Sequence, residues 1–366
     1  MSGVRSELSD RPWLDDEQFR SIVNAAIWAP SADNHHALEF GLDANAIDIW
    51  ADPAFPRLAM HRRVLGLISL GAVIENIQLR SAELGFRCTT RLFPSSTPEH
   101  VASVRLHVSD AARASDLASA IFTRQTNRRF FHGPSLTAAE RTRIAAEASS
   151  SGRTHLWWLD EKEQRRKFLA LARMAEAARF GCAPLHHELF EAIRFDVGWQ
   201  AAANEGLAPA SLEIERLLRA SFKLIANPRV MTPLARIGVQ HLLAWRSGDL
   251  PCRLAPHIGV IASEKTVDLD EAAFEAGRTL QRTWLRLTTL GVEVQPLAAT
   301  TVFALDEYED VPPRIRQSLA HGWAALLPDT RPLIAFRAGH ASPPTMRNGR
   351  MPVDRYLRKT TNSVPQ

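Results

Sequence analysis

The spacing of apolar and polar positions along the 366 residues predicts both helices and strands. Apolar residues recur at helical spacing in five segments: 16–29, 66–85, 114–124, 137–150 and 271–290. Short apolar runs between turn residues predict strands at 38–42, 46–52, 104–109, 154–160, 257–263, 292–297 and 332–339. From 161 to 246 the pattern is again helical, with breaks near Gly181–Pro184 and Pro228–Pro233. We expect the Pro- and Arg-rich tail from Ala341 to be extended.

A repeat links two of the predicted helices. The segment GAVIENIQLRSAELGF begins at Gly71, and GRTLQRTWLRLTTLGV begins at Gly277. Without gaps they match at Gly71/Gly277, Leu79/Leu285, Leu84/Leu290 and Gly85/Gly291, all at an offset of 206. A weaker echo relates IDIWAD near Trp50 to HLWWLD near Trp158. Chance agreement between two Leu-rich helices is one interpretation. The other is that two related halves pack in one chain as a dimer would.

The second interpretation predicts a particular architecture. We expect an α+β fold in which each half has a mainly antiparallel sheet wrapped by helices. The two halves would pack around the long helices near 71–85 and 277–290. Residues 1–120 would form the first half and 121–366 the second, with a helical insert at about 161–250. We expect that insert to cap a ligand site; otherwise it is an elaboration on the outside.

Composition narrows the function classes. The net charge is only +4, from 44 basic and 40 acidic residues, and it is spread along the chain. This argues against a nucleic-acid-binding protein, which usually concentrates its basic residues on one module. Three cysteines far apart indicate neither a disulfide framework nor a metal clamp. The N-terminus is polar, and no apolar run approaches the roughly 20 residues that span a bilayer. We therefore expect a cytoplasmic protein without a membrane partner.

Three stretches carry candidate chemistry. IFTRQTNRRFF (121–131) places three arginines beside aromatic residues, a composition that suits a nucleic acid, a phosphorylated ligand or a solvated helix end. APSADNHH (29–36) lies in a helix-to-strand loop whose small polar groups could bind a flat heterocycle. QPLAAT (295–300) ends a strand with short side chains that leave room for a bulky ligand. Loops and strand ends often have such residues for structural reasons alone.

Taken together, the three stretches resemble the flavin-binding pattern of the nitroreductase family. That pattern combines an R-x-S/T-x-R segment, an A-P-S-x-x-N-x-Q-P-W loop and basic residues near the C-terminus. The first is matched by RQTNR at 124–128, and the loop by Ala29, Pro30, Ser31 and Asn34. Arg347 and Arg350 match the last part. The resemblance covers roughly 16–135 and 255–357.

The order of these motifs implies a single-chain arrangement. In the family, one subunit of a homodimer supplies the arginine segment and its partner supplies the A-P-S loop. Here both lie in one chain, which looks most like the branch that includes the mycobacterial Acg-type proteins. The resemblance implies a monomer with an internal pseudo-dimer, although a higher oligomer is left open. It also implies one complete FMN site between the halves, with the reciprocal site empty.

The resemblance implies which residues contact FMN. Guanidinium groups bind a phosphate through paired hydrogen bonds, and the residues expected there are Arg124, Arg128, Arg347 and Arg350, with Thr126 as a neutral donor. The other expected contacts are Pro30, Ser31, Ala32, Asn34, His36, Gln295, Pro296, Leu297 and Ala298. His36 stands where the family has Gln. It either titrates near neutral pH and tunes the flavin or is a tolerated substitution.

The implied function is a flavin oxidoreductase. NAD(P)H, bound only transiently, would reduce FMN, which would then reduce a small electron-poor substrate such as a nitroaromatic or a quinone by ping-pong hydride transfer. The alternative is a protein that stores FMN without turnover. The sequence indicates no catalytic acid, and His186-His187-Glu188 lacks the companions that a metal site needs. We expect no metal and no nucleic acid.

Overall fold

The computed structural model describes residues 14–110, 112, 114–149 and 152–358. It contains two four-stranded sheets that are antiparallel throughout. The first has the order β1 (Leu38–Asp43), β2 (Ala46–Ala51), β4 (His100–Val108), β3 (Phe86–Leu92). The second has the order β5 (Thr154–Trp158), β6 (His257–Glu264), β8 (Thr330–Gly339), β7 (Glu293–Pro296). Corresponding strands take corresponding places, which confirms an α+β fold of two related halves.

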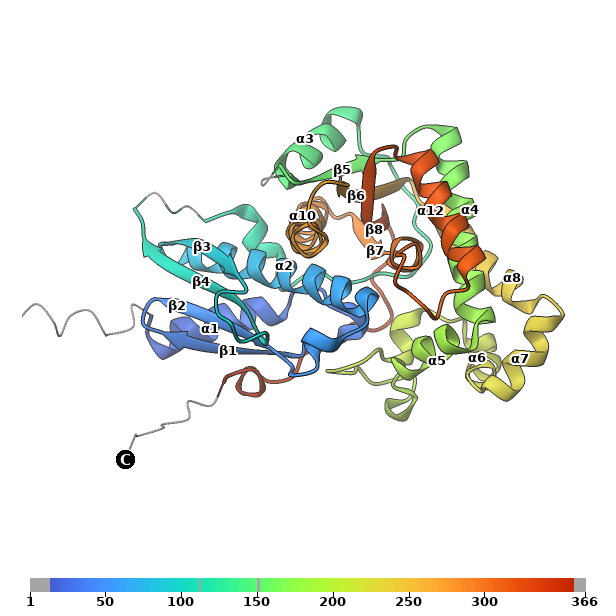
Figure 1. Cartoon of the computed structure of the whole chain (residues 1–366), viewed down its shortest axis with the longest axis horizontal. Coiled ribbons are helices and arrows are strands. Elements are labelled where there is room, and N and C mark those ends of the chain that lie inside the picture. Colours follow the sequence, from blue (N-terminus) through green and yellow to red (C-terminus); the bar gives the residue numbers. More distant parts are fainter. Residues whose placement is uncertain (1–13, 111, 113, 150–151, 359–366) are drawn as a thin grey trace, which may run out of the picture.

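Helices surround and separate the sheets (Figure 1). The first half contributes α1 (Asp16–Ile27) and α2 (Met60–Glu83). The second contributes α3 (Ala138–Ala148), α10 (Leu269–Thr289), α11 (Ala299–Val302) and α12 (Pro313–Leu326). The remaining helices are α4 (Lys162–Gly181), α5 (Ala183–Glu191), α6 (Arg219–Ile225), α7 (Pro228–Arg236), α8 (Val239–Ala244) and α9 (Leu250–Leu254). Within the described ranges, none of these helices is both long and apolar enough to cross a membrane.

The helical insert occupies one link of the second half. All of α4–α9 lies between β5 and β6, where the first half has only the tight turn at 44–45 between β1 and β2. In Figure 1 the insert covers the side of the molecule opposite the first sheet.

The strand order shows that the weaker sequence repeat does not relate equivalent strands. Trp50 lies on β2 and Trp158 on β5, and these strands occupy different places in their sheets.

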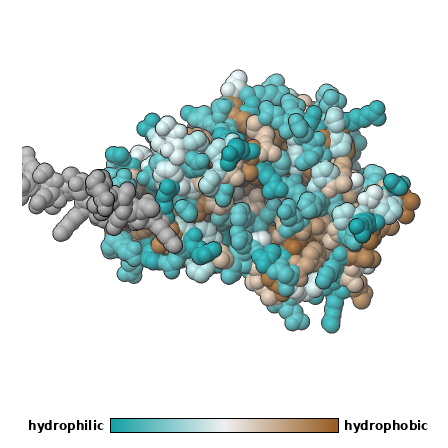
Figure 2. All heavy atoms as spheres, turned by 60° about the horizontal axis from the view of Figure 1, so that its bottom comes forward, coloured by the Kyte–Doolittle hydropathy of each residue, from teal (hydrophilic) through white to brown (hydrophobic). Residues whose placement is uncertain are grey.

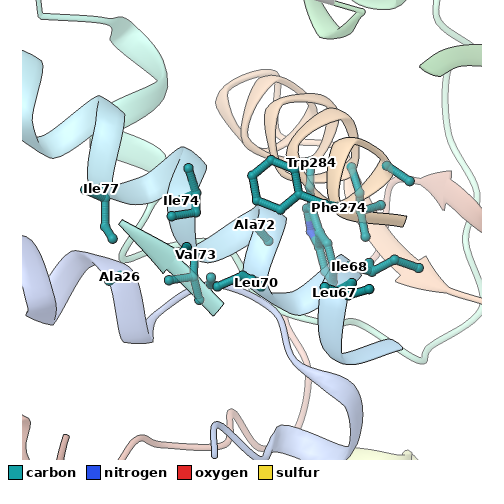
Figure 3. Packing of buried hydrophobic residues seen from close by; sticks show 14 of the residues in the cluster. Ala26, Leu67, Ile68, Leu70, Ala72, Val73, Ile74, Ile77, Phe274 and Trp284 are labelled. Carbon is teal, nitrogen blue, oxygen red and sulfur yellow. The ribbon is translucent and has the colours of Figure 1, made fainter. Parts of the chain in front are cut away.

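The repeated glycines mark the point where α2 and α10 cross. A Cβ on Gly71 would lie 2.0 Å from the carbonyl oxygen of Phe274, and one on Gly277 would lie 1.9 Å from that of Ile68. The two contacts are reciprocal, because each glycine meets the residue three positions before the other. Apolar side chains of both helices pack around this crossing (Figure 3). The predicted packing of two halves around these helices is thus confirmed.

Polar groups also join the two central helices. Glu75, with only 3% of its side chain exposed, pairs with Arg282 at 2.5 Å and with Arg278 at 3.3 Å. Gln281 Nε2 donates to Asn76 Oδ1 at 2.7 Å. A buried carboxylate is tolerated because two guanidinium groups neutralise it.

The C-terminal tail of the second half pairs with the sheet of the first. Phe40 N donates to Tyr356 O at 2.7 Å, and Arg358 N donates to Phe40 O at 2.9 Å. Within the second half, Thr126 forms a bridge with Val294 of β7. These contacts bring the predicted ligand-binding stretches towards the joint between the halves.

Several predicted elements differ from the structure. The segment 114–124 is a short 3-10 helix (Asp116–Ala120) followed by turns, not an α-helix. The Ser115 hydroxyl accepts from Leu117 N at 3.2 Å and so favours a tight turn. The sequence prediction also missed β3 and α12. The tail is extended, as expected, except for a 3-10 turn at Val353–Arg355.

The crossing yields a test of the fold. We expect Gly277→Ala to lower the free energy of unfolding by about 3 kcal/mol or more, because backbone on both sides prevents relaxation. Gly71→Ala should have a similar effect, since its contact is the reciprocal one. Gly41→Ala is the control, because its Cβ would meet nothing closer than 4.0 Å. Urea denaturation of the three variants would contradict this account of the repeat if all three were equally stable.

Candidate functional site

One cavity of about 350 Å³ opens where both halves and the insert meet. This volume is within the range of small-ligand sites. The central helices form part of its wall through Leu65, Ile68 and Ser69 of α2 and Leu280 and Trp284 of α10. The insert adds residues of α4 and α5 and of the segment 207–212. The insert is therefore a wall of the cavity and not only an outer elaboration.

The structure brings most of the predicted site residues to this cavity. Twelve of the fourteen line it: Pro30, Ser31, Ala32, Asn34, Arg124, Thr126, Arg128, Gln295, Pro296, Ala298, Arg347 and Arg350. His36 and Leu297 are absent from the lining. Leu297 N instead donates to Ala335 O at 2.7 Å, which extends the pairing of β7 with β8. Two of these stretches, 29–36 and 347–350, are more than 300 residues apart in the chain.

Arg124 is a buried cation with no ion pair to any described residue. Only 4% of the residue is exposed, and its guanidinium lies 4.4 Å from the ring centre of Trp284. Nη2 donates to Trp28 O at 2.8 Å, whereas the buried Nε has no hydrogen-bond partner. Burial, and then the charges of Arg350 and Arg347, lower the pKa of Arg124 well below its usual value. The charged form is therefore disfavoured here, although arginine stays protonated in proteins.

Arg347 and Arg350 complete this cluster from the C-terminal tail. Arg347 Nη2 donates to Arg124 O at 3.1 Å, and Arg350 donates to Ala29 O at 2.9 Å and to Ile27 O at 2.5 Å. Their guanidinium carbons lie 4.3 and 5.3 Å from the ring centre of Trp28. Burial lowers the pKa of Arg350 to about 10. Over the described ranges, no carboxylate lies within 4 Å of any of the three arginines.

Arg128 belongs to a different part of the cavity. Its Nη1 donates to Ser211 O of the insert at 3.0 Å. Burial lowers its pKa to about 10, and the charges that act on it are those of Asp33, Arg179 and Glu213. None of these belongs to the Arg124–Arg347–Arg350 cluster. Of the four arginines expected around one phosphate, Arg124, Arg347 and Arg350 therefore lie together, whereas Arg128 interacts with other groups.

The 29–36 loop reaches the cavity in a left-handed turn. Asp33 and Asn34 have φ of 53° and 57°, which short polar residues adopt most readily. The Asn34 amide is already engaged: Nδ2 donates to Gly206 O at 3.1 Å, and Oδ1 accepts from Arg350. Asn34 therefore ties the loop to both the insert and the tail. The Ser31 hydroxyl, by contrast, is buried at the cavity without a hydrogen-bond partner.

A second buried arginine orients the strand-end residues. Arg337 on β8 is fully buried, and its Nε donates to Gln295 Oε1 at 2.7 Å. Its Nη2 donates to Arg129 O at 2.8 Å, and its guanidinium lies 4.0 Å from the ring centre of Phe131. Phe131 is 2% exposed and anchors the arginine segment in the core. Arg337 thus fixes both Gln295 and the 121–131 stretch.

His36 has a structural role, and the expectation that it titrates near neutral pH is wrong. Its Nε2 lies 3.0 Å from Ala29 O, so this nitrogen has to be the protonated one that donates. Burial and the charge of Arg350 lower the pKa of His36 to about 3. At physiological pH the ring is therefore neutral, and it stabilises the 29–36 loop through its hydrogen bond to Ala29 O.

Sequence reasoning missed a polar group on the insert side of the cavity. The rings of His61 and Tyr308 stack with centres 3.5 Å apart, and the Tyr308 hydroxyl donates to Glu188 at 2.5 Å. Arg62 pairs with the same carboxylate at 3.1 Å. Burial alone would raise the pKa of Glu188, but His61, Tyr308 and Arg62 outweigh it and lower the pKa to about 2. No motif joins these residues, because each comes from a different part of the chain.

His186 and Glu188 of the 186–188 segment lie in different surroundings. His186 lies 2.9 Å from Ile225 O within the insert, whereas Glu188 faces the cavity. Across the described residues, no group of three or more His, Cys, Asp or Glu side chains is placed to hold a metal ion.

Comparisons with known proteins find similarity only among solved structures. No family model matches the chain, and no curated protein matches it. A nitroreductase with bound FMN from Bacteroides fragilis is 8% identical, with a TM-score of 0.37, over 69% of this chain and 100% of that one. The FMN-dependent nitroreductase NfnB from Mycobacterium smegmatis, in complex with NADPH, is 15% identical over 62% of this chain and 90% of that one, with a TM-score of 0.32.

A third similar structure is an NADPH:FMN oxidoreductase from Vibrio harveyi in complex with NAD⁺. It is 12% identical over 67% of this chain and 77% of that one, with a TM-score of 0.36. Similarities at this level carry no argument about this chain. Its function has to be inferred from its own cavity, and the Acg-type resemblance stays a prediction.

The state of His36 can be tested through pH. Its folded pKa of about 3 lies below the ordinary 6.5, so the unfolded chain binds a proton that the folded protein does not between these values. Stability should therefore fall as pH falls through this window. In the parent, His36 should change the free energy of unfolding by less than about 1.4 kcal/mol per pH unit. We expect His36→Gln to lack this contribution. Denaturant unfolding of both proteins from pH 7 to pH 4 measures it, and parallel curves would contradict the assignment.

Proposed function

We propose that the cavity binds FMN and that the chain is an FMN-dependent oxidoreductase. In this proposal NAD(P)H is a transient co-substrate, and the acceptor is a small electron-poor molecule of the nitroaromatic or quinone type. One observation carries the proposal: Arg124, Arg347 and Arg350 converge on the cavity with no carboxylate beside them in the described chain.

The arginine cluster favours an anionic ligand because a buried charge is costly unless it is paired. Each guanidinium leaves donor capacity beyond its bonds to carbonyl oxygens. A phosphate dianion supplies charge and several acceptors at once, and its bonds to arginine are the strong, charge-assisted kind. Two buried donors without a partner, Arg124 Nε and the Ser31 hydroxyl, belong to residues that line the same cavity. The residues present therefore fit a phosphate-bearing cofactor.

The remaining lining suits a flat ring system. Trp28 lines the cavity beside Arg347 and Arg350, while Pro296 and Ala298 leave the strand end uncrowded. The side-chain amide of Gln295 is fixed at this end, because its Oε1 accepts a hydrogen bond from Arg337. Such a combination of apolar walls with a few fixed polar groups is typical of cofactor sites.

When bound, FMN would supply the hydride chemistry. The protein's own residues bind and orient it: the three arginines would hold the phosphate, and the 29–34 loop and the strand end at 295–298 would flank the ring. The insert wall, from α5 to 212, would limit the access of water. Glu188 lies on that wall, and His61 and Tyr308 contact it from outside the insert, so a second substrate would enter beside these three residues.

The phosphate assignment predicts a preference among flavins. We expect FMN to bind the purified protein much more tightly than riboflavin, which has the same ring without the phosphate. Arg124→Ala removes charge-assisted hydrogen bonds worth roughly 1.5–3 kcal/mol, so it should weaken FMN about ten- to a hundredfold. Riboflavin binding should change little. Titrations followed by flavin fluorescence measure both ligands.

Two variants control for this experiment. Arg347→Ala removes a less buried member of the cluster and should also weaken FMN, whereas Arg105→Ala removes an exposed arginine on β4 and should not. Asn34→Ala should have a smaller effect than Arg124→Ala, because its amide contacts the chain itself. Equal FMN affinity in the parent and in both cluster variants would refute the site.

A separate experiment distinguishes turnover from storage. We expect NADH or NADPH to bleach the visible absorbance of the FMN-loaded protein without oxygen, and a quinone or nitroaromatic to restore it. Steady-state rates at several acceptor concentrations should then give parallel double-reciprocal lines, as ping-pong kinetics require. Bound FMN that neither nucleotide reduces would instead support the storage alternative.

A further inference from the structure

The outer part of the insert has an unusual surface. Several large apolar residues of the described chain are exposed, and six of them fall within 215–246: Leu217, Leu218, Leu224, Ile237, Leu242 and Trp245. Leu217 is 93% exposed and Ile237 is 77% exposed. They lie on or beside the short helices α6, α7 and α8. Figure 2 shows hydrophobic surface gathered at this end of the molecule. We call these six residues the apolar patch.

The same segment is strongly basic. Between 215 and 246 the chain has one acidic residue, Glu215, and six basic ones: Arg216, Arg219, Lys223, Arg229, Arg236 and Arg246. Arg246 pairs with Glu215, and Arg219 lies over the ring of Trp199. The other four are exposed, and none has a carboxylate within 4 Å among the described residues. An excess of exposed cations thus accompanies the apolar patch.

We propose that this surface docks the protein on an anionic lipid bilayer. Short helices with Leu, Ile and Trp between Lys and Arg have the composition of peripheral membrane-binding elements, whose apolar side chains enter the interface while the cations meet lipid phosphates. The proposal differs from the expectation, drawn from the lack of a spanning segment, that no membrane is a partner. It does not depend on the cofactor.

The charges favour a bilayer over the other occupants of such a patch. A second copy seated symmetrically would bring like charges together, which opposes association. A nucleic acid would satisfy the cations but leave the projecting side chains of Leu217 and Ile237 in water. A bilayer with anionic lipids accommodates both.

Cosedimentation of the full chain with lipid vesicles tests the proposal. We expect binding to vesicles of phosphatidylcholine with phosphatidylglycerol, much weaker binding to phosphatidylcholine alone, and weakening by salt. The combined change Lys223→Gln, Arg229→Gln and Arg236→Gln should weaken binding roughly a hundredfold. The combined change Leu217→Gln, Ile237→Gln and Leu242→Gln should also abolish stable binding. The six side chains replaced in the two triple variants are all exposed, so circular dichroism should show unchanged folding.

The matched control is Val108→Gln, an apolar residue that is 69% exposed on β4 of the other half. It should leave vesicle binding intact. The proposal is overturned if the parent fails to sediment with anionic vesicles, or if the two triple variants sediment as the parent does. It is also overturned if light scattering shows a dimer that the apolar variant converts to a monomer without any vesicle binding by the parent, since the patch would then be a self-association surface.

Discussion

The close approach of α2 and α10 at Gly71 and Gly277 is the constraint on which the other features depend. With no Cβ at either position, the backbone of each helix contacts the other at Ile68 and Phe274. Helices that pack this closely have little freedom to slide, because the crossing point is fixed by shape on both sides. The two sheets, each held to one of these helices, are thereby fixed relative to one another. The cavity wall formed by Leu65, Ile68, Leu280 and Trp284 is part of the same helix pair.

The pseudo-symmetry of this crossing is broken where the cavity lies. At the offset of 206, Trp284 corresponds to Gln78 and Ser69 corresponds to Glu275. Trp284 and Ser69 line the cavity, whereas Gln78 and Glu275 both accept from Arg278. Arg278 also pairs with the buried Glu75. Arg278 on that side has acids beside it, whereas Arg124, Arg347 and Arg350 at the cavity have no carboxylate within 4 Å among the described residues. The two halves share a backbone plan, but the cavity side of the crossing holds this cluster of cations.

The sequence determined the fold more directly than the site. The glycine repeat and alternating patterns are local, and so they predicted the central helices and most strands. The arginine segment and the 29–34 loop were also recognisable, because each is a contiguous motif. The cluster of His61, Glu188 and Tyr308 was not, since its members meet only after the insert folds back on α2. His36 shows another limit: its ring nitrogen bonds to Ala29 O behind the loop, and no pattern of residue types indicates which way a side chain turns.

The arginine cluster lies where the C-terminal tail meets the first half, so ligand binding there affects this contact. Arg124 and Arg347 are 223 residues apart, and they are linked by one hydrogen bond to a backbone carbonyl and through their contacts with Trp28. Three cations held together in this way repel one another, which opposes the closed arrangement of the tail against the first half. An anion that binds all three removes that repulsion and adds bonds to each segment. A ligand that binds only the folded state stabilises it by mass action, so occupation of the cavity should stabilise the contact between the tail and the first half. The insert is tied to the same loop through Asn34 and Gly206, so its contact with the loop should be stabilised as well.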